Sequence, residues 1–191
     1  MKNLRKLTTM AILTAVSVVL VAIIHFPIFP AVSFLEYDPA DIAVLICGFA
    51  FGPVAGICVT AAASLIQGLT VSAQSGIYGI IMHIIATSAL VLTSSLIYKR
   101  NKSKKGALIS IISGVAAMTL VMIPANLFIT PYFMGAPRAA VVALLPYIVL
   151  FNFIKAGVNG GVTFFVYKKI SRLIHKFDKD EPALSGSDSG E

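Results

Sequence analysis

The sequence is poor in charge, since only 12% of its 191 residues are Asp, Glu, Lys or Arg, whereas 58% are hydrophobic. Soluble domains carry about a quarter charged residues, so this scarcity excludes an ordinary soluble domain and indicates an integral membrane protein. The alternation of apolar and polar residues that is typical of strands is also missing, and apolar runs of about twenty residues recur. We therefore expect helices, because a helix satisfies its own backbone hydrogen bonds in lipid.

Acidic residues are scarcer still, and none lies in an apolar run. Before the C-terminal tail there are only three, Glu36, Asp38 and Asp41, and all belong to the proline-containing segment 27–41. A self-sufficient secondary transporter is the first alternative that we consider. It predicts inverted repeats and an acidic relay within the membrane, and neither is visible in the sequence.

Enzyme signatures are missing as well. The sequence has no phosphate-binding glycine loop ending in Lys-Ser/Thr, no His-Glu-x-x-His and no Gly-x-Ser-x-Gly. His25, His83 and His175 are far apart and lack nearby acidic partners, so we expect no metal site and interpret His83 as a packing residue. Cys47 and Cys58 lie in apolar surroundings and are interpreted as free thiols. An intramembrane enzyme is therefore disfavoured, and energy for uphill transport would have to come from another subunit.

Basic residues are concentrated in three clusters, within residues 2–6, 99–105 and 168–176. Positive charges at helix ends follow the positive-inside rule, which favours a membrane protein over a nucleic-acid-binding one. All three clusters share one side of the membrane only if residues 42–66 form two short helices rather than one. Gly52-Pro53 is the predicted junction, because proline removes a backbone donor and clashes with the preceding turn.

The predicted fold is an all-α membrane bundle of six helices with both termini in the cytoplasm. The predicted spans are about 7–26, the two short helices within 42–66, 77–98, 107–129 and 141–167, with outward loops at 27–41, 68–76 and 130–138. The first span is expected to be retained and not removed as a signal peptide. Residues 1–176 are predicted to form a single membrane-embedded domain. Residues 177–191 are expected to be an acidic, disordered cytoplasmic tail.

The last span carries a polar face in an otherwise apolar helix. Asn152, Lys155, Asn159 and Thr163 are spaced i, i+3, i+7 and i+11, which places them on one side of a helix. A lysine near the centre of a membrane helix costs roughly 2.5–3.5 kcal/mol, so this face must point toward other helices or a wet cavity. It serves either as a polar contact between helices or as a ligand site. For Lys155 the only nearby carboxylates are those of segment 27–41, which would have to fold over it.

Three further polar residues are candidates for ligand binding. Asn126 follows Pro124, which frees a backbone carbonyl, so its amide either satisfies the backbone or contacts a ligand. Thr130 lies one turn further along the same face. Gln67 flanks the loop at 68–76 and belongs to either a pocket or its rim.

Taken together, these features resemble the substrate-binding S components of energy-coupling factor (ECF) vitamin transporters over residues 5–170. The riboflavin-specific branch is the most similar, through "FP" at 26–27 followed by "YDPADIAVLICGFAFGPVAG", through "LVMIPANLFITPYF" and through "LLPYIVLFNFIKAGVN". Ala11 and Ala15 in the first span match the family's Ala-x-x-x-Ala, a spacing that lets another helix approach closely. The connection "YFMGAPRAAVVALLPY" is shorter than in several riboflavin members, which leaves open another flat heterocycle such as a benzimidazole or a thiamine-like compound.

The resemblance implies a function for these residues. Asn126 and Lys155 would bond the polar edge of the isoalloxazine or the ribityl chain, and the first loop around Phe34 and Leu35 would close over the vitamin. The chain would be a multi-pass protein of the plasma membrane, without catalytic activity and without a cofactor other than the transported vitamin. It would dock through the Ala11/Ala15 face on a transmembrane coupling protein, and two cytosolic ATPases would drive release inside. The full set of candidate ligand-binding residues is Asn126, Lys155, Asn152, Asn159, Thr130, Phe34, Leu35 and Gln67.

Overall fold

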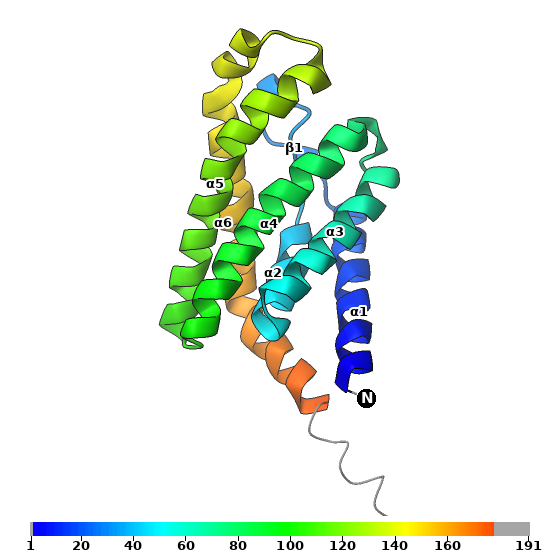
Figure 1. Cartoon of the computed structure of the whole chain (residues 1–191), viewed down its shortest axis with the longest axis vertical. Coiled ribbons are helices and arrows are strands. Elements are labelled where there is room, and N and C mark those ends of the chain that lie inside the picture. The colour runs from blue at the N-terminus through cyan, green and yellow to red at the C-terminus, as the bar shows by residue number, and fades with distance from the viewer. Residues whose placement is uncertain (1, 178–191) are drawn as a thin grey trace, which may run out of the picture.

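The computed structural model describes residues 2–177, which contain six α-helices (Figure 1). These are α1 (Lys2–Ile23), α2 (Ala40–Phe51), α3 (Pro53–Leu69), α4 (Gly76–Arg100), α5 (Lys104–Met134) and α6 (Arg138–Phe177). The predicted acidic tail, 177–191, lies outside the described residues except for its first residue. An all-helical bundle is therefore confirmed.

Four helices of the described chain, α1, α4, α5 and α6, are long and apolar enough to cross a membrane. The other two, α2 and α3, have 12 and 17 residues and are shorter than a full crossing requires. The predicted junction between them is confirmed. Gly52 has φ of 91°, a backbone conformation that favours glycine, and Pro53 is the first residue of α3, where its missing N–H costs no hydrogen bond.

The connection between α5 and α6 is shorter than predicted. Residues 130–134, expected to be loop, continue α5 through Pro131 to Met134. The prediction was wrong because a proline inside a membrane helix removes only one donor, and neighbouring groups accommodate the change. The helix ends instead at Gly135, which has the left-handed φ of 60° and donates its N–H to the Pro131 carbonyl. α6 then begins at Arg138, so the two helices pack as close antiparallel neighbours.

The first outward loop contains two short strands that the sequence did not predict. β1 (Phe26–Pro27) and β2 (Glu36–Tyr37) pair antiparallel, and a short 3-10 turn, η1 (Pro30–Val32), lies between them. Val32 is fully buried against Val141 and Ile148 of α6. The loop is thus a structured element that folds onto α6, and Figure 1 shows it close to the upper part of that helix.

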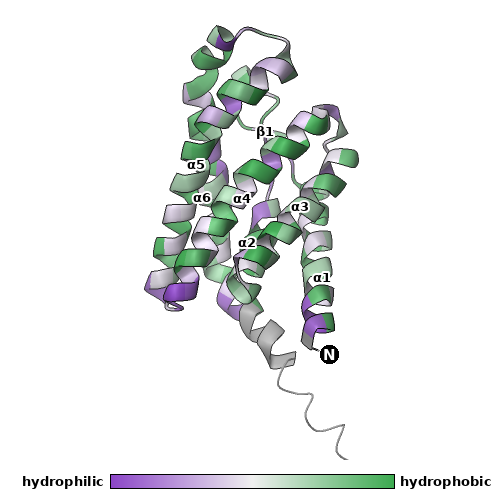
Figure 2. Ribbon diagram, viewed as in Figure 1, coloured by the Kyte–Doolittle hydropathy of each residue, from purple (hydrophilic) through white to green (hydrophobic). Residues whose placement is uncertain are grey.

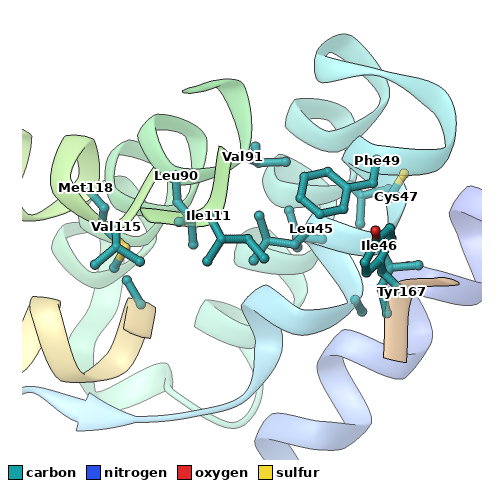
Figure 3. Close-up of a cluster of buried hydrophobic side chains, with 14 of the residues drawn as sticks. Leu45, Ile46, Cys47, Phe49, Leu90, Val91, Ile111, Val115, Met118 and Tyr167 are labelled. Carbon is teal, nitrogen blue, oxygen red and sulfur yellow. The ribbon is translucent and has the colours of Figure 1, made fainter. Parts of the chain in front are cut away.

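The apolar core is centred on α2. Residues 43–49 of this helix are all buried, so α2 is covered on every side by other helices. Leu45 lies in a cluster with Leu90 and Val91 of α4, Met118 of α5 and Tyr167 of α6 (Figure 3). Because α2 occupies the centre of the bundle, the loop that leads into its first turn also ends in the interior.

The basic clusters lie at one end of the molecule. In Figure 2, hydrophilic residues gather at the start of α1 and at the α4–α5 turn. Figure 1 shows that α6 ends at this same end of the molecule. The opposite end carries the α5–α6 connection and the loop between α1 and α2. This grouping is the arrangement that the two short helices were predicted to produce.

Candidate ligand-binding site

The polar face of α6 points into the bundle, as predicted. Its four residues are all buried, with exposures of 2% for Asn152, 5% for Lys155 and 0% for both Asn159 and Thr163. Polar groups at this depth need hydrogen-bond partners, because an unpaired buried group costs free energy. Asn152 and Thr163 donate to carbonyl oxygens of α6 itself, whereas the partners of Lys155 and Asn159 come from the first loop and from α2.

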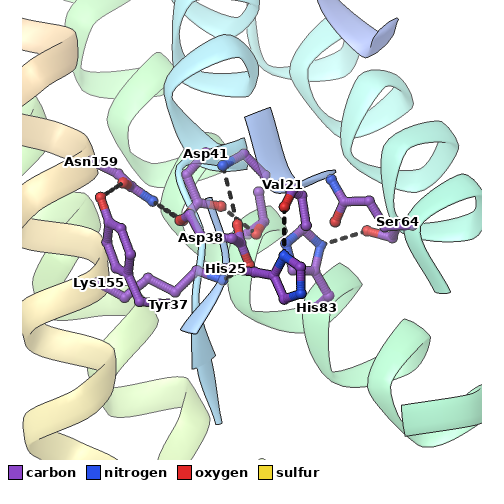
Figure 4. Close-up of polar contacts among 12 residues, drawn as sticks. Val21, His25, Tyr37, Asp38, Asp41, Ser64, His83, Lys155 and Asn159 are labelled. Carbon is purple, nitrogen blue, oxygen red and sulfur yellow. Dashed lines mark hydrogen bonds and ion pairs between the residues drawn. The ribbon is translucent and has the colours of Figure 1, made fainter. Parts of the chain in front are cut away.

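Lys155 forms an ion pair with Asp38 of the first loop (Figure 4). The distance from Lys155 Nζ to Asp38 Oδ2 is 2.7 Å, and both side chains are buried. Asp38 Oδ1 also accepts a hydrogen bond from the Ala40 N–H at 3.1 Å. Burial raises the pKa of the Asp38 carboxyl, but the Lys155 ammonium outweighs burial, so the net pKa lies below its ordinary value. Segment 27–41 therefore folds over Lys155 and supplies the carboxylate that the sequence indicates as its nearest possible partner.

Asn159 fastens the end of the same loop to α6. Its Nδ2 donates to the backbone carbonyl of Asp38 and to Asp41 Oδ2, both at 2.9 Å, and its Oδ1 accepts from the Tyr37 hydroxyl at 3.0 Å. Asp41, which the sequence placed in the loop, lies in the first turn of α2 and also accepts from Thr87 Oγ1 at 2.7 Å. These bonds occupy both hydrogens of the Asn159 amide, and its side chain lies outside the walls of the cavities described below.

A cavity of about 130 Å³ lies beside the Lys155–Asp38 pair. Its polar wall comes from the first loop and from α3, α4 and α6, and includes Asp38, Ser64, Gln67, His83, Asn152 and Lys155. The apolar wall includes Phe34 and Leu35 of the loop, Met82 of α4, Met118 and Met122 of α5, and Phe151 of α6. This cavity thus offers both hydrogen-bonding groups and apolar surface.

A second cavity of about 70 Å³ adjoins the first and shares several of its walls. The shared residues include Phe34, Leu35, Met82 and Met122, and the second cavity adds Tyr78, Ile129 and Phe133 as further apolar walls. Its polar groups include Asn126 and Thr130 of α5. Asn126 Nδ2 donates to the Met122 carbonyl at 2.8 Å, and Thr130 Oγ1 donates to Asn126 Oδ1 at 2.9 Å. Asn126 therefore bonds within its own helix and still borders the cavity.

The structure brings seven of the eight candidate ligand residues to the walls of these two cavities. Phe34, Leu35, Gln67, Asn152 and Lys155 line the first, and Phe34, Leu35, Asn126 and Thr130 line the second. Asn159 is the exception. Ala11 and Ala15 lie elsewhere, exposed on the outer surface of α1.

Sequence reasoning missed part of the cavity wall. Ser64 of α3 was not a candidate, since a serine within an apolar helix has no local pattern that identifies it as part of a cavity wall. His83 was interpreted as a packing residue, but only one of its ring nitrogens has a hydrogen-bond partner. The signal for His83 is a long-range contact with Ser64, and periodicity along one helix does not show such a contact.

Comparison with known proteins gives consistent matches over most of the chain. The family "ECF transporter, substrate-specific component" matches residues 5–167. The riboflavin transporter FmnP of Bacillus subtilis (strain 168) is 30% identical, over 91% of this chain and 96% of that protein. The riboflavin transporter RibU of Staphylococcus aureus (strain TCH60) is 29% identical, over 92% of this chain and 95% of that protein. A solved structure described as the S component of a bacterial ECF transporter superposes with a TM-score of 0.80 at 30% identity, over 91% of this chain and 99% of that one.

Proposed function

The chain belongs to the substrate-specific components of ECF transporters, and we propose that it captures riboflavin and delivers it across the plasma membrane. It is a multi-pass membrane protein of the riboflavin-transporter group, since two curated relatives that match over more than nine-tenths of the chain are riboflavin transporters. The relatives are transport proteins and not enzymes. We expect ATP hydrolysis to occur in partner subunits, because the sequence lacks an ATP-binding motif.

The observation that carries the proposal is the division of the site into a more polar cavity, the first, and a more apolar one, the second. Riboflavin has the matching parts, a flat isoalloxazine ring and a flexible ribityl chain with several hydroxyls. Ligand pockets generally combine apolar walls with a few fixed polar groups, as this pair of cavities does. We place the ribityl chain in the first cavity, near Lys155 and Asn152, and the ring in the second, near Asn126 and Thr130.

Binding requires the two cavities to merge. Pockets for ligands of this size are about 300–1,000 Å³, which is more than either cavity provides. Phe34 and Leu35 line both cavities and belong to the first loop, so a shift of this loop opens a common space and its return covers the vitamin. Asn159 contributes by holding the end of the loop against α6, through its bonds to Asp38 and Tyr37.

We further propose the assembly in which this subunit works. Six membrane crossings with both termini in the cytoplasm are supported by the three basic clusters at one end of the bundle. Ala11 and Ala15 are exposed on α1, where small residues allow close approach of a transmembrane coupling protein. Two cytosolic ATPases bound to that protein would supply the energy for release inside.

The proposal is tested by purifying the protein from a riboflavin-containing host and recording its visible absorption. Bound flavin gives a yellow protein, and removal of the flavin followed by titration with riboflavin gives saturable quenching of riboflavin fluorescence. Thiamine and benzimidazole, added as competitors, should leave this quenching unchanged. A colourless protein that also fails to quench riboflavin fluorescence refutes riboflavin as the ligand. Displacement by one of the two competitors would assign the site to that heterocycle.

A further inference from the structure

His83 of α4 has one hydrogen-bonded ring nitrogen and one that is unpaired. Its Nδ1 lies 2.7 Å from Ser64 Oγ, whereas its Nε2 is buried without a partner (Figure 4). Within residues 3–170, whose side chains the structure describes, the other buried side-chain atoms of this kind belong to Ser94, Ser95 and Tyr167, and none of these residues lines the first cavity. His83 does line it, so a residue of the wall of the proposed ribityl site carries a buried nitrogen with an unmet hydrogen bond.

The contacts of Ser64 determine which nitrogen of His83 carries the proton. Ser64 Oγ lies 2.7 Å from the Thr60 carbonyl oxygen and 2.7 Å from His83 Nδ1. A carbonyl oxygen only accepts, so the single hydroxyl hydrogen of Ser64 is donated to Thr60. Ser64 Oγ then accepts from His83, which places the ring proton on Nδ1. In a neutral imidazole the other nitrogen is an acceptor, and Nε2 therefore presents a lone pair.

His83 is neutral in this arrangement because the carboxylates around it have other partners. Asp38 is bonded to Lys155, and Asp41 is bonded to Asn159 and Thr87. Glu36, which lines the same cavity, accepts a hydrogen bond from Gln74. A charged imidazolium beside the Lys155 ammonium would lack a carboxylate of its own, and burying an unpaired charge is strongly unfavourable. The cavity wall thus combines donors, on Lys155 and Asn152, with a buried acceptor that has no partner, His83 Nε2.

We infer that His83 Nε2 accepts a hydrogen bond from a hydroxyl of the ribityl chain and so selects flavins that carry this chain. A hydroxyl can donate to His83 while it accepts from a neighbouring donor. The isoalloxazine edge has one donor, its N3–H, but we place the ring in the second cavity, which His83 does not line. A flavin without hydroxyls leaves the nitrogen unpaired, and a site built to bond a hydroxyl discriminates against analogues that lack it. This inference rests on the proposed function and names a specificity residue within that site.

The test compares two substitutions of His83 with two ligands. His83→Met removes the acceptor and keeps an apolar side chain of similar length, whereas His83→Gln can present an amide oxygen near the position of Nε2. We expect His83→Met to weaken riboflavin binding about tenfold, about 1.4 kcal/mol, and His83→Gln to restore most of the affinity. Lumiflavin, which has a methyl group in place of the ribityl chain, should bind the wild-type and His83→Met proteins with the same affinity.

Each result supports or overturns the inference. Affinities are measured by fluorescence quenching on protein freed of bound flavin, after thermal melting has shown that each variant is folded. Unchanged riboflavin binding by His83→Met overturns the inference. An equal loss of affinity for riboflavin and lumiflavin also overturns it, because His83 would then be a packing residue. If lumiflavin does not bind the wild type at all, the comparison of the two variants with riboflavin decides. Recovery of riboflavin affinity in His83→Gln supports the acceptor role, and an equal loss of affinity in His83→Gln and His83→Met refutes it. Failure of the wild type to bind riboflavin would instead refute the proposed function.

Discussion

Helices α1 and α6 have similar apolar compositions and opposite roles. Both are long enough to cross a membrane, but 17% of the most apolar segment of α1 is buried and 33% of that of α6. The buried face of α6 carries Asn152, Lys155, Asn159 and Thr163, whereas the outer face of α1 presents small residues, Ala11 and Ala15. Hydropathy thus identifies both helices as membrane helices but does not distinguish their functions. The function depends on whether the polar or small residues lie on the buried face, as in α6, or on the outer face, as in α1.

The first loop is what makes the polar face of α6 stable. Asp38 neutralises Lys155, and Asn159 bonds the loop backbone, so these buried groups have partners. Burying a charge is costly, and the attraction within the pair offsets this cost only when the geometry is good. α1 needs no such element, because it carries no charged residue between Lys6 and Ile23.

The largest predicted effect tests the role of α1. Ala11→Trp and Ala15→Trp should each abolish riboflavin uptake by cells, because a large side chain blocks the approach of the coupling protein. Riboflavin binding by the purified variants should stay within twofold of the wild type. Val158→Trp, on the exposed side of α6, is the matched control and should support normal uptake. Normal uptake by both alanine variants would contradict the assignment of the docking face to α1.

The next effect concerns the ion pair of α6. Lys155→Ala leaves Asp38 buried without its partner and should lower the free energy of unfolding by about 3 kcal/mol. Asp38→Asn combined with Lys155→Ala should recover a large part of this loss, since no unpaired charge remains. Denaturant unfolding of the single and double variants in detergent measures the difference. Additive losses would mean that the two residues do not stabilise each other.

Lys155→Ala should also weaken riboflavin binding at least tenfold, about 1.4 kcal/mol, because the lysine is a donor in the polar cavity. Affinity is measured below the melting temperature of the variant, so that unfolding does not imitate weak binding. An unchanged affinity in the folded variant would restrict Lys155 to holding the loop.

A smaller effect distinguishes two glycines of α6, of which Gly160 is buried and Gly157 is half-buried. A Cβ on Gly160 would lie 2.5 Å from Cγ2 of Ile111, whereas no atom lies within 4 Å of a Cβ on Gly157. Gly160→Leu should therefore destabilise the fold by about 1–3 kcal/mol through overpacking. Gly157→Leu, where the added side chain meets no neighbouring helix, should leave the melting temperature almost unchanged. Equal melting temperatures for the two variants would show that α6 is rotated relative to this packing.

The smallest effect is a predicted insensitivity to mild acid. The pKa of Asp38 lies below its ordinary value in the folded protein, so the pair contributes stability above the unfolded pKa. That contribution disappears only as pH falls through the lowered folded value. Acidification from pH 7 to about 5 should therefore leave the melting temperature unchanged, and a loss attributable to Asp38 should begin below about pH 4. The Lys155→Ala, Asp38→Asn protein is the control, since it lacks this titration.

Local patterns in the sequence predicted much of the fold. The break at Gly52-Pro53, the inward polar face of α6 and the grouping of the basic clusters all follow from the periodicity, proline chemistry and charge of nearby residues. The same reasoning failed at Pro131, where a proline lies inside α5 instead of ending it. The two strands of the first loop were also missed, because two-residue strands are too short to show alternation.

By itself, the sequence determined that Lys155 faces the interior and requires a partner, since helical periodicity and the cost of a buried charge are local properties. Only the tertiary structure decided that the partner is Asp38, 117 residues away, and that Ser64 orients His83 from another helix. These pairings depend on how the first loop and helices α3, α4 and α6 pack around α2. Periodicity shows which face of a helix a residue occupies, whereas packing determines what that face meets.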